Sequence, residues 1–288
     1  MITRSILYTC LTALAFMTSA GSTSCQTPSE DVVTIWIHGT KLTPRFIFPH
    51  FFYRKVGLHP ASSYDNKYHM RLMAETLCSD KTAFSFEHFY FFGWSGKLSF
   101  QERKNAAQHL YNEIQALQKQ YRARTGTSPK IRIITHSHGG NVALNLAHYV
   151  ADESTLLIDE LILLACPVQD QTMHLMAHPV FKKVFSIYSD KDMIQVIDPQ
   201  GLYARGTSGS LFSRRTFPPL DKLVQIKIFM GERSLAHIEF LMLNFLRILP
   251  EIIQEVPSFH SNMCSANIGK HRNAQQHHYE PIVTITSC

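Results

Sequence analysis

Charged residues are scarce in this chain, and it has few long apolar runs. Only 17% of the 288 residues are Asp, Glu, Lys or Arg, while 45% are hydrophobic. That balance excludes a disordered chain and favours one large domain over two small ones. Past the N-terminus, no stretch without charges is long enough to cross a bilayer, and there is no internal repeat. We therefore expect a soluble or peripherally anchored protein.

Motifs for nucleic acid, phosphate and metal binding are also missing. The net charge is +6, but the positive residues are scattered and form no dense run interleaved with aromatic residues, which argues against a nucleic-acid partner. Gly93-Trp94-Ser95-Gly96 lacks the lysine and the spacing of a phosphate-binding loop. The 16 histidines include a cluster near the end of the chain, but it has no carboxylates beside it. We expect neither a metal nor a cofactor.

The N-terminus has the features of a signal peptide. Arg4 supplies a short positive region, residues 6–17 are almost wholly apolar, and Ala20 ends a run of small residues suited to cleavage. Residues 1–20 are therefore expected to be removed, and the protein to be exported to the periplasm, the cell surface or the medium. Cys25 leaves a second route open. Lipoprotein-type cleavage after residue 24 would anchor the chain through this cysteine, although Ser22 stands where an aliphatic residue is usual.

The cysteines allow one disulfide prediction. If Cys25 is lipidated, four cysteines remain, which could pair in an oxidising compartment. Cys264 and Cys288 are the favoured pair, because both lie in the irregular region near the C-terminus. Cys166 instead ends a strand predicted to be buried, and we expect it to be an inert thiol.

Short apolar runs alternate with helix-like segments along the chain. Strands are predicted over residues 31–37, 84–92, 131–134, 161–165, 184–188 and 224–230. This pattern is typical of an α/β fold with a mostly parallel central sheet flanked by helices. We place that domain at residues 31–257. Residues 258–288 are expected to form a polar C-terminal tail with a short β-like end at 282–285.

Three helices are predicted between these strands. A long helix follows Ser99 and Glu102, which have the spacing of a capping box, and Gly126 is expected to end it. Residues 141–150 form a second helix. Residues 237–249 form a third, which Pro250 is expected to end.

The segment Thr135-His136-Ser137-His138-Gly139-Gly140 lies between a predicted strand and a predicted helix. A serine on a sharp turn of this kind is typical of a nucleophile elbow, in which the strained turn lifts the hydroxyl out of the sheet. Strand and helix pack closely there, so small residues are needed near the serine. Gly139 meets that need, whereas Thr135 stands where glycine is usual.

A serine hydroxyl needs a base, and the base needs an orienting acid. Asp192 follows the predicted strand 184–188, and His237 follows the strand 224–230. Loops at the carboxyl ends of parallel strands gather at one edge of a sheet, so both side chains are expected near Ser137. Asp190 competes with Asp192 for the role of the acid.

The order nucleophile, acid, histidine within this strand pattern resembles the α/β-hydrolase superfamily, especially its small lipases and esterases, over about residues 31–250. The resemblance implies that Ser137 is the nucleophile, His237 the general base and acid, and Asp192 the orienting acid. The family's two earliest strands are absent, so a minimal version of the α/β-hydrolase fold is expected.

The resemblance also implies an oxyanion hole. His38-Gly39-Thr40 matches the family's His-Gly loop after an early strand. The backbone N–H groups of Thr40 and His138 would hold the oxyanion, with His38 and Gly39 supporting the loop.

The sequence thus predicts an exported serine hydrolase of the carboxylesterase or lipase type, which cleaves acyl or lipid esters through an acyl-enzyme. Thioesterase, amidase and acyltransferase activities remain alternatives, since they share the same triad. A catalytically silent surface binding protein is an alternative of another class. The expected partner is a small-molecule or lipid ester, and peripheral contact with a membrane stays open.

Two segments bear on the substrate. Residues 46–53 are rich in aromatic side chains and follow the predicted oxyanion loop, so they either line an acyl pocket or pack in the core. Residues 199–220 form a long loop between the acid and the histidine, which is either a lid or a solvated loop.

Overall fold

The computed structural model describes residues 32–41, 55–79, 83–151, 156–197, 214–256, 263–272 and 279–287. The predicted signal segment with Cys25, the aromatic stretch 46–53, most of the loop 199–220 and Cys288 lie outside these ranges. The expectations for those segments therefore stay predictions. Of the helices in the described ranges, none combines the length and the apolar content that crossing a bilayer requires.

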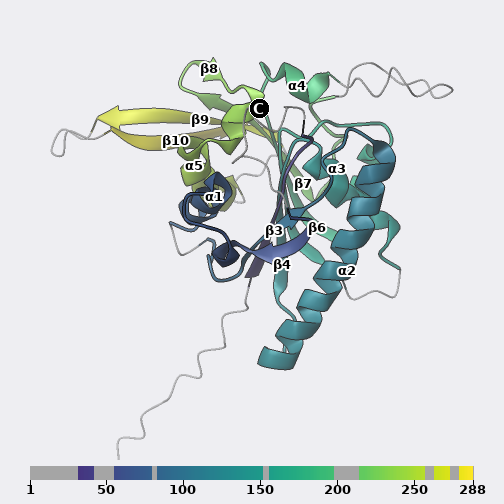
Figure 1. The fold of residues 1–288 in the computed structure, drawn as a ribbon. Helices are drawn as coiled ribbons and strands as arrows, with labels where there is room; N and C mark the ends of the chain where they lie inside the picture. The colour runs from purple at the N-terminus through teal and green to yellow at the C-terminus, as the bar shows by residue number, and fades with distance from the viewer. Residues whose placement is uncertain are drawn as a thin grey trace, which may run out of the picture.

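One sheet runs through the molecule, and all of the described strands belong to it (Figure 1). They are β1 (Val32–Ile37), β2 (Gly57–Pro60), β3 (Phe89–Gly93), β4 (Lys130–His136), β5 (Ile158–Leu164), β6 (Phe181–Tyr188), β7 (Leu223–Met230), β8 (Arg233–Ser234), β9 (Met263–Arg272) and β10 (Tyr279–Ser287). Their order is β2-β3-β1-β4-β5-β6-β7-β9-β10, and β8 pairs with β7. The neighbours from β3 to β9 are parallel, whereas β2, β8 and β10 each pair antiparallel. The predicted mostly parallel sheet is confirmed.

Helices cover both faces of the sheet. Helix α2 (Phe100–Thr125) contacts α3 (Gly139–Leu144) on one face, and α1 (His69–Leu77) contacts α5 (Leu243–Glu255) on the other (Figure 1). A separate apolar cluster lies under each pair. The central strands are therefore buried on both sides, which explains why they read as continuous apolar runs.

Helix α2 begins and ends where its sequence signals predict. The Ser99 hydroxyl accepts a hydrogen bond from the Glu102 N–H, which satisfies one of the donors left open at a helix start. Gly126 follows the last turn with φ of 81°, a left-handed conformation that glycine adopts without strain.

The closing helix differs from its prediction. Residues 237–241 form a 3-10 turn, η5 (His237–Leu241), and α5 then continues through Pro250 to Glu255. Proline removes one N–H donor from a helix interior, at a cost of roughly 3 kcal/mol. The helix continues because the apolar residues around Pro250 are buried under the sheet. They are Phe245, Leu246, Ile248, Leu249, Ile252 and Ile253.

Three smaller differences concern elements near the site. The helix predicted over 141–150 begins earlier, at Gly139, and tightens into a 3-10 turn, η2 (Asn145–His148). The strand predicted over 84–92 is confined to β3, since the residues before it form turns. The antiparallel edge strand β2 was not predicted, and its proline at position 60 is typical of an edge position.

The C-terminal residues do not form the expected polar tail. Strand β9 pairs parallel with β7, and β10 pairs antiparallel with β9, so both extend the central sheet. Cys264, Ala266 and Ile268 alternate toward the core beside α5, while Asn267 is exposed. The alternation of buried and exposed residues along β9 was not recognised in the sequence, because many residues of this segment are small or polar. Cys264 is buried and its register partner is Ser287, next to Cys288 in the chain, so the disulfide stays a prediction.

Candidate active site

Ser137 occupies a strained turn between β4 and α3. Its φ is 54°, in the left-handed region that side chains other than glycine rarely adopt. Neighbouring backbone holds this conformation, since the Ser137 N–H donates to the Leu164 carbonyl and the Gly140 N–H donates to the Ser137 carbonyl. Thr135 stands where glycine is usual, and its buried hydroxyl donates to the Ile162 carbonyl on the adjacent strand.

Two glycines allow the loop after β1 to touch this turn. A Cβ atom on Gly39 would lie 2.7 Å from Cβ of Ser137, and one on Gly139 would lie 2.6 Å from the Ile37 carbonyl oxygen. Neither distance is compatible with a side chain. The loop that follows β1 is therefore in direct contact with the serine, where an oxyanion loop would have to be.

The two proposed oxyanion donors lie on either side of this contact. Thr40 and His138 are buried, and within the described part of the chain neither backbone N–H donates a hydrogen bond. Buried N–H groups normally have an acceptor. An N–H pair held in this way is suited to an oxygen that carries negative charge.

His38 braces the same loop. Its Nδ1–H donates to the Gly39 carbonyl, and its Nε2 accepts from the Trp94 N–H, so the ring is a neutral donor and acceptor. The indole of Trp94 stacks on the ring and donates to the His38 carbonyl. Burial lowers the pKa of His38 to about 4, which keeps it neutral. These contacts fix the loop and leave His38 no role as a base.

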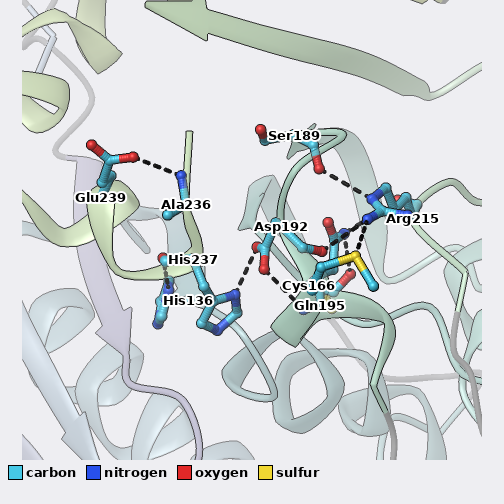
Figure 2. Close-up of polar contacts among 10 residues, drawn as sticks. His136, Cys166, Ser189, Asp192, Gln195, Arg215, Ala236, His237 and Glu239 are labelled. Carbon is cyan, nitrogen blue, oxygen red and sulfur yellow. Dashed lines mark hydrogen bonds and ion pairs between the residues drawn. The ribbon is translucent and has the colours of Figure 1, made fainter. Parts of the chain in front are cut away.

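Asp192 and His237 form a buried pair at the same edge of the sheet (Figure 2). His237 Nδ1 donates to Asp192 Oδ2 at 2.7 Å, and Asp192 Oδ1 accepts from the Gln195 N–H at 3.0 Å. The second bond makes Asp192 the N-cap of α4 (Met193–Val196) and holds its carboxylate toward the histidine. An imidazole bonded through Nδ1 presents Nε2 as an acceptor.

Asp190 has another partner. Its carboxylate forms an ion pair with Lys227 on β7, and its side chain is 51% exposed. The structure thus brings Asp192, and not Asp190, to His237.

The segment that carries His237 is fastened on both sides. Glu239 accepts from the Ala236 N–H (Figure 2). Glu239 also forms a bidentate ion pair with Arg233 of β8, which lowers the pKa of Glu239. His136 Nε2 donates to the His237 carbonyl at 3.0 Å, and the two rings lie 4.6 Å apart. His136 precedes the serine, so this contact ties the histidine segment to the end of β4.

Ser137 itself is not hydrogen-bonded to His237 among the described residues. The contact between a nucleophile and its base is often long without substrate and tightens in the complex. The flanking histidines are not rivals as base, because burial holds the pKa of His136 and of His138 well below the usual range. His237, by contrast, bonds through Nδ1 to the Asp192 carboxylate.

Three further residues support the site and were missed in the sequence. Asn141 of α3 donates to the Pro167 carbonyl and accepts from Thr172, which joins the helix after Ser137 to the loop after β5. Gln195 and Arg215 fasten the loop that carries Asp192 (Figure 2). Gln195 had a weak signal, the capping distance from Asp192. The others bind groups far away in sequence and had none.

No family model matches the sequence, and no curated protein sequence does. Solved structures do resemble the fold. An alpha-beta serine hydrolase homologue from Coxiella burnetii aligns at 13% identity and a TM-score of 0.39, covering 77% of this chain and 83% of that one. The phospholipase PlaB from Legionella pneumophila, in complex with thio-NAD, aligns at 12% identity and a TM-score of 0.34. That alignment covers 88% of this chain, which spans about half of the phospholipase, 48%. Likenesses this distant leave function to be argued from the chain's own residues.

Those residues do identify the architecture. In this mostly parallel sheet, the strained turn at Ser137 follows β4, Asp192 follows β6 and His237 follows β8, and the three lie at one edge of the sheet. That is how α/β hydrolases are built, and the chain has the α/β-hydrolase fold.

Proposed function

We propose that this protein is a serine hydrolase that cleaves carboxylic esters. The observation that carries the proposal is the buried Asp192–His237 pair, 2.7 Å between Oδ2 and Nδ1, beside the strained turn at Ser137. A buried carboxylate that fixes an imidazole near a strained serine is the arrangement that activates a hydroxyl.

The proposed reaction proceeds through an acyl-enzyme. Ser137 Oγ attacks the ester carbonyl while His237 Nε2 takes the hydroxyl proton, and Asp192 stabilises the imidazolium. The carbonyl oxygen, now negative, accepts from the N–H groups of Thr40 and His138. His237 then gives its proton to the departing alcohol. Water, activated by the same imidazole, attacks the acyl-enzyme and releases the acid with Ser137 restored.

The substrate is proposed to carry an apolar acyl or lipid part. Large apolar side chains are exposed soon after Asp192 and after His237, on α4 and η5 or directly after them, and these two elements contact each other. They are Met193, Ile194, Ile197, Ile238 and Met242. Apolar side chains gathered beside a reactive group favour an apolar substrate portion. Turnover measured over a series of oxygen esters of increasing chain length, with thioesters and amides alongside, tests this specificity.

A fluorophosphonate probe and the variant Ser137→Ala test the nucleophile. We expect the probe to label the wild-type protein at Ser137, and the variant to lose labelling and roughly 10⁴-fold or more of ester turnover while its thermal midpoint stays close to wild type. Ser234→Ala removes a serine of β8 near the same edge and serves as the matched control. Labelling that persists in Ser137→Ala would assign the nucleophile to another residue. A wild-type protein that neither reacts nor turns over any ester would indicate a silent binding protein.

A further inference from the structure

Arg215 binds the backbone of the loop that carries the acid. Its Nε donates to the Ser189 carbonyl at 3.1 Å, and its Nη2 donates to the Asp192 carbonyl at 3.0 Å (Figure 2). One planar guanidinium therefore spans the turn from the end of β6 to Asp192 itself. Since the two donors are held in a rigid fork, the two carbonyls are held at a fixed separation.

The backbone of Arg215 is fixed in turn on both sides. Arg214 forms an antiparallel bridge with Val168, with both N–H···O bonds at 3.0 Å. Two residues later, the buried amide of Gln225 accepts from the Phe217 N–H and donates to the Phe217 carbonyl. The guanidinium of Arg215 is thus presented from a segment that is itself anchored to the loop after β5 and to β7.

Gln195 adds a reciprocal tie. Its backbone N–H bonds to the Asp192 carboxylate, while its buried side-chain amide donates to the carbonyls of Cys166 and Arg215. The acid loop and the Arg215 segment therefore hold each other, and both are joined to the end of β5.

We propose that Arg215 is a positioning residue for the triad, which sets the place of the Asp192 carboxylate against His237 by clamping the carbonyls of Ser189 and Asp192. The role in turnover rests on the proposed function, whereas the effect on the Asp192–His237 hydrogen bond does not. Arg215 touches none of the reacting groups. Arg215 is proposed to act only through Asp192. The proposal is therefore testable, because substituting Arg215 should have little further effect in a variant that already lacks the Asp192 carboxylate.

Steady-state kinetics in a double-mutant cycle test the coupling. Arg215→Met keeps the length of the side chain and removes its donors, and we expect kcat to fall about 100-fold with KM nearly unchanged, the size of effect that a misplaced group about 1 Å off produces. Arg215→Lys, which can reach one carbonyl, is expected to lose less. In an Asp192→Asn background, Arg215→Met is expected to change kcat less than about threefold. Arg214→Met is the matched control, since this neighbouring side chain is 64% exposed and pairs only loosely with Asp170, at 3.9 Å.

A spectroscopic readout separates this proposal from the proposed function. The proton shared by His237 Nδ1 and Asp192 gives a low-field NMR resonance, which Asp192→Asn identifies by its loss. We expect Arg215→Met to shift or abolish it and Arg214→Met to keep it, whether or not any ester is a substrate. Equal losses of kcat from Arg215→Met in both backgrounds, or an unchanged resonance in folded Arg215→Met, would overturn the positioning role. Loss of the resonance in a protein without ester turnover would keep that role and reject the ester hydrolase.

Discussion

Three histidines around the serine share one physical condition, which is burial of the imidazole ring. His38 and His136 lie in the loop after β1 and at the end of β4, and His138 follows Ser137. Burial is the main reason that the pKa of each is lowered, to about 4 for His38. Because burial removes the hydration that a charged ring needs, protonation at each of these positions is unfavourable.

The first consequence at this scale is a loss of stability in acid. Between pH 6.5 and about 4, unfolded His38 binds a proton that the native ring excludes, so the free energy of unfolding falls as the pH decreases and is fully regained above pH 6.5. For His38 alone the loss is about 3 kcal/mol. Urea unfolding at pH 7.5, 6 and 5 measures it. His38→Gln, which keeps a donor and an acceptor without a titrating group, should flatten this dependence, and His174→Gln at an exposed site should not. A wild-type stability that stays level down to pH 5 would contradict the account.

At the scale of elements, the decisive contact joins α3 to the end of β1. Gly139 begins the helix directly against backbone carbonyls, with Ile37 and His38 oxygens 2.6 and 2.7 Å from where a Cβ would stand. These atoms are main chain and cannot rotate away. The closeness of helix and loop determines where the proposed oxyanion donors lie relative to Ser137.

Gly139→Ala tests this packing, because the contact predicts a decrease in the free energy of unfolding where an alanine in a helix would ordinarily cause an increase. Glycine to alanine within a helix ordinarily raises stability by roughly 0.5–1 kcal/mol. Here we expect the free energy of unfolding to fall by about 1–3 kcal/mol, because the added methyl forces the loop away from α3. The rate of labelling by a fluorophosphonate should fall with it, since Thr40 moves with the loop. Denaturant unfolding and labelling kinetics measure the two effects. A variant as stable and as reactive as wild type would show that the contact is looser than described.

For the whole molecule, the notable feature is that the sheet does not end at β7. Strand β9 returns from α5 to pair with β7, which covers an edge that would otherwise be open. Its buried residues complete the apolar cluster beneath α1 and α5. The C-terminal strands therefore belong to the core of the domain.

A matched pair of charge substitutions separates a core strand from a solvated tail. Ala266→Asp places a carboxylate in the buried cluster and should lower the free energy of unfolding by several kcal/mol, because a buried charge without a partner loses its hydration. Asn267→Asp adds the same group one residue along, on the exposed face of β9, and should change stability by less than about 0.5 kcal/mol. Thermal unfolding of both variants is the measurement. Equal, small effects would return residues 263–287 to the polar tail expected from the sequence.

The sequence by itself determined what depends on neighbours in the chain. Continuous apolar runs predicted the parallel strands, and Ser99 and Gly126 predicted both ends of α2, since capping uses groups a few residues apart. The position of Ser137 between a strand and a helix was likewise predicted from neighbouring residues. The order of Ser137, Asp192 and His237 along the chain indicated the α/β hydrolases. Each of these signals is local, or is an order along the chain.

Only the tertiary structure decided what depends on residues far apart. It determined that β9 pairs with β7 and that Pro250 lies within a helix. It also determined that Asp190 forms an ion pair with Lys227, whereas Asp192 is hydrogen-bonded to His237. It also allowed Arg215 to donate hydrogen bonds to two backbone carbonyls of a loop more than twenty residues earlier in the chain. Backbone carbonyls have no sequence signature, and burial under a sheet can outweigh a helix-breaking residue. The energies that settled these features come from contacts that form when the layers pack.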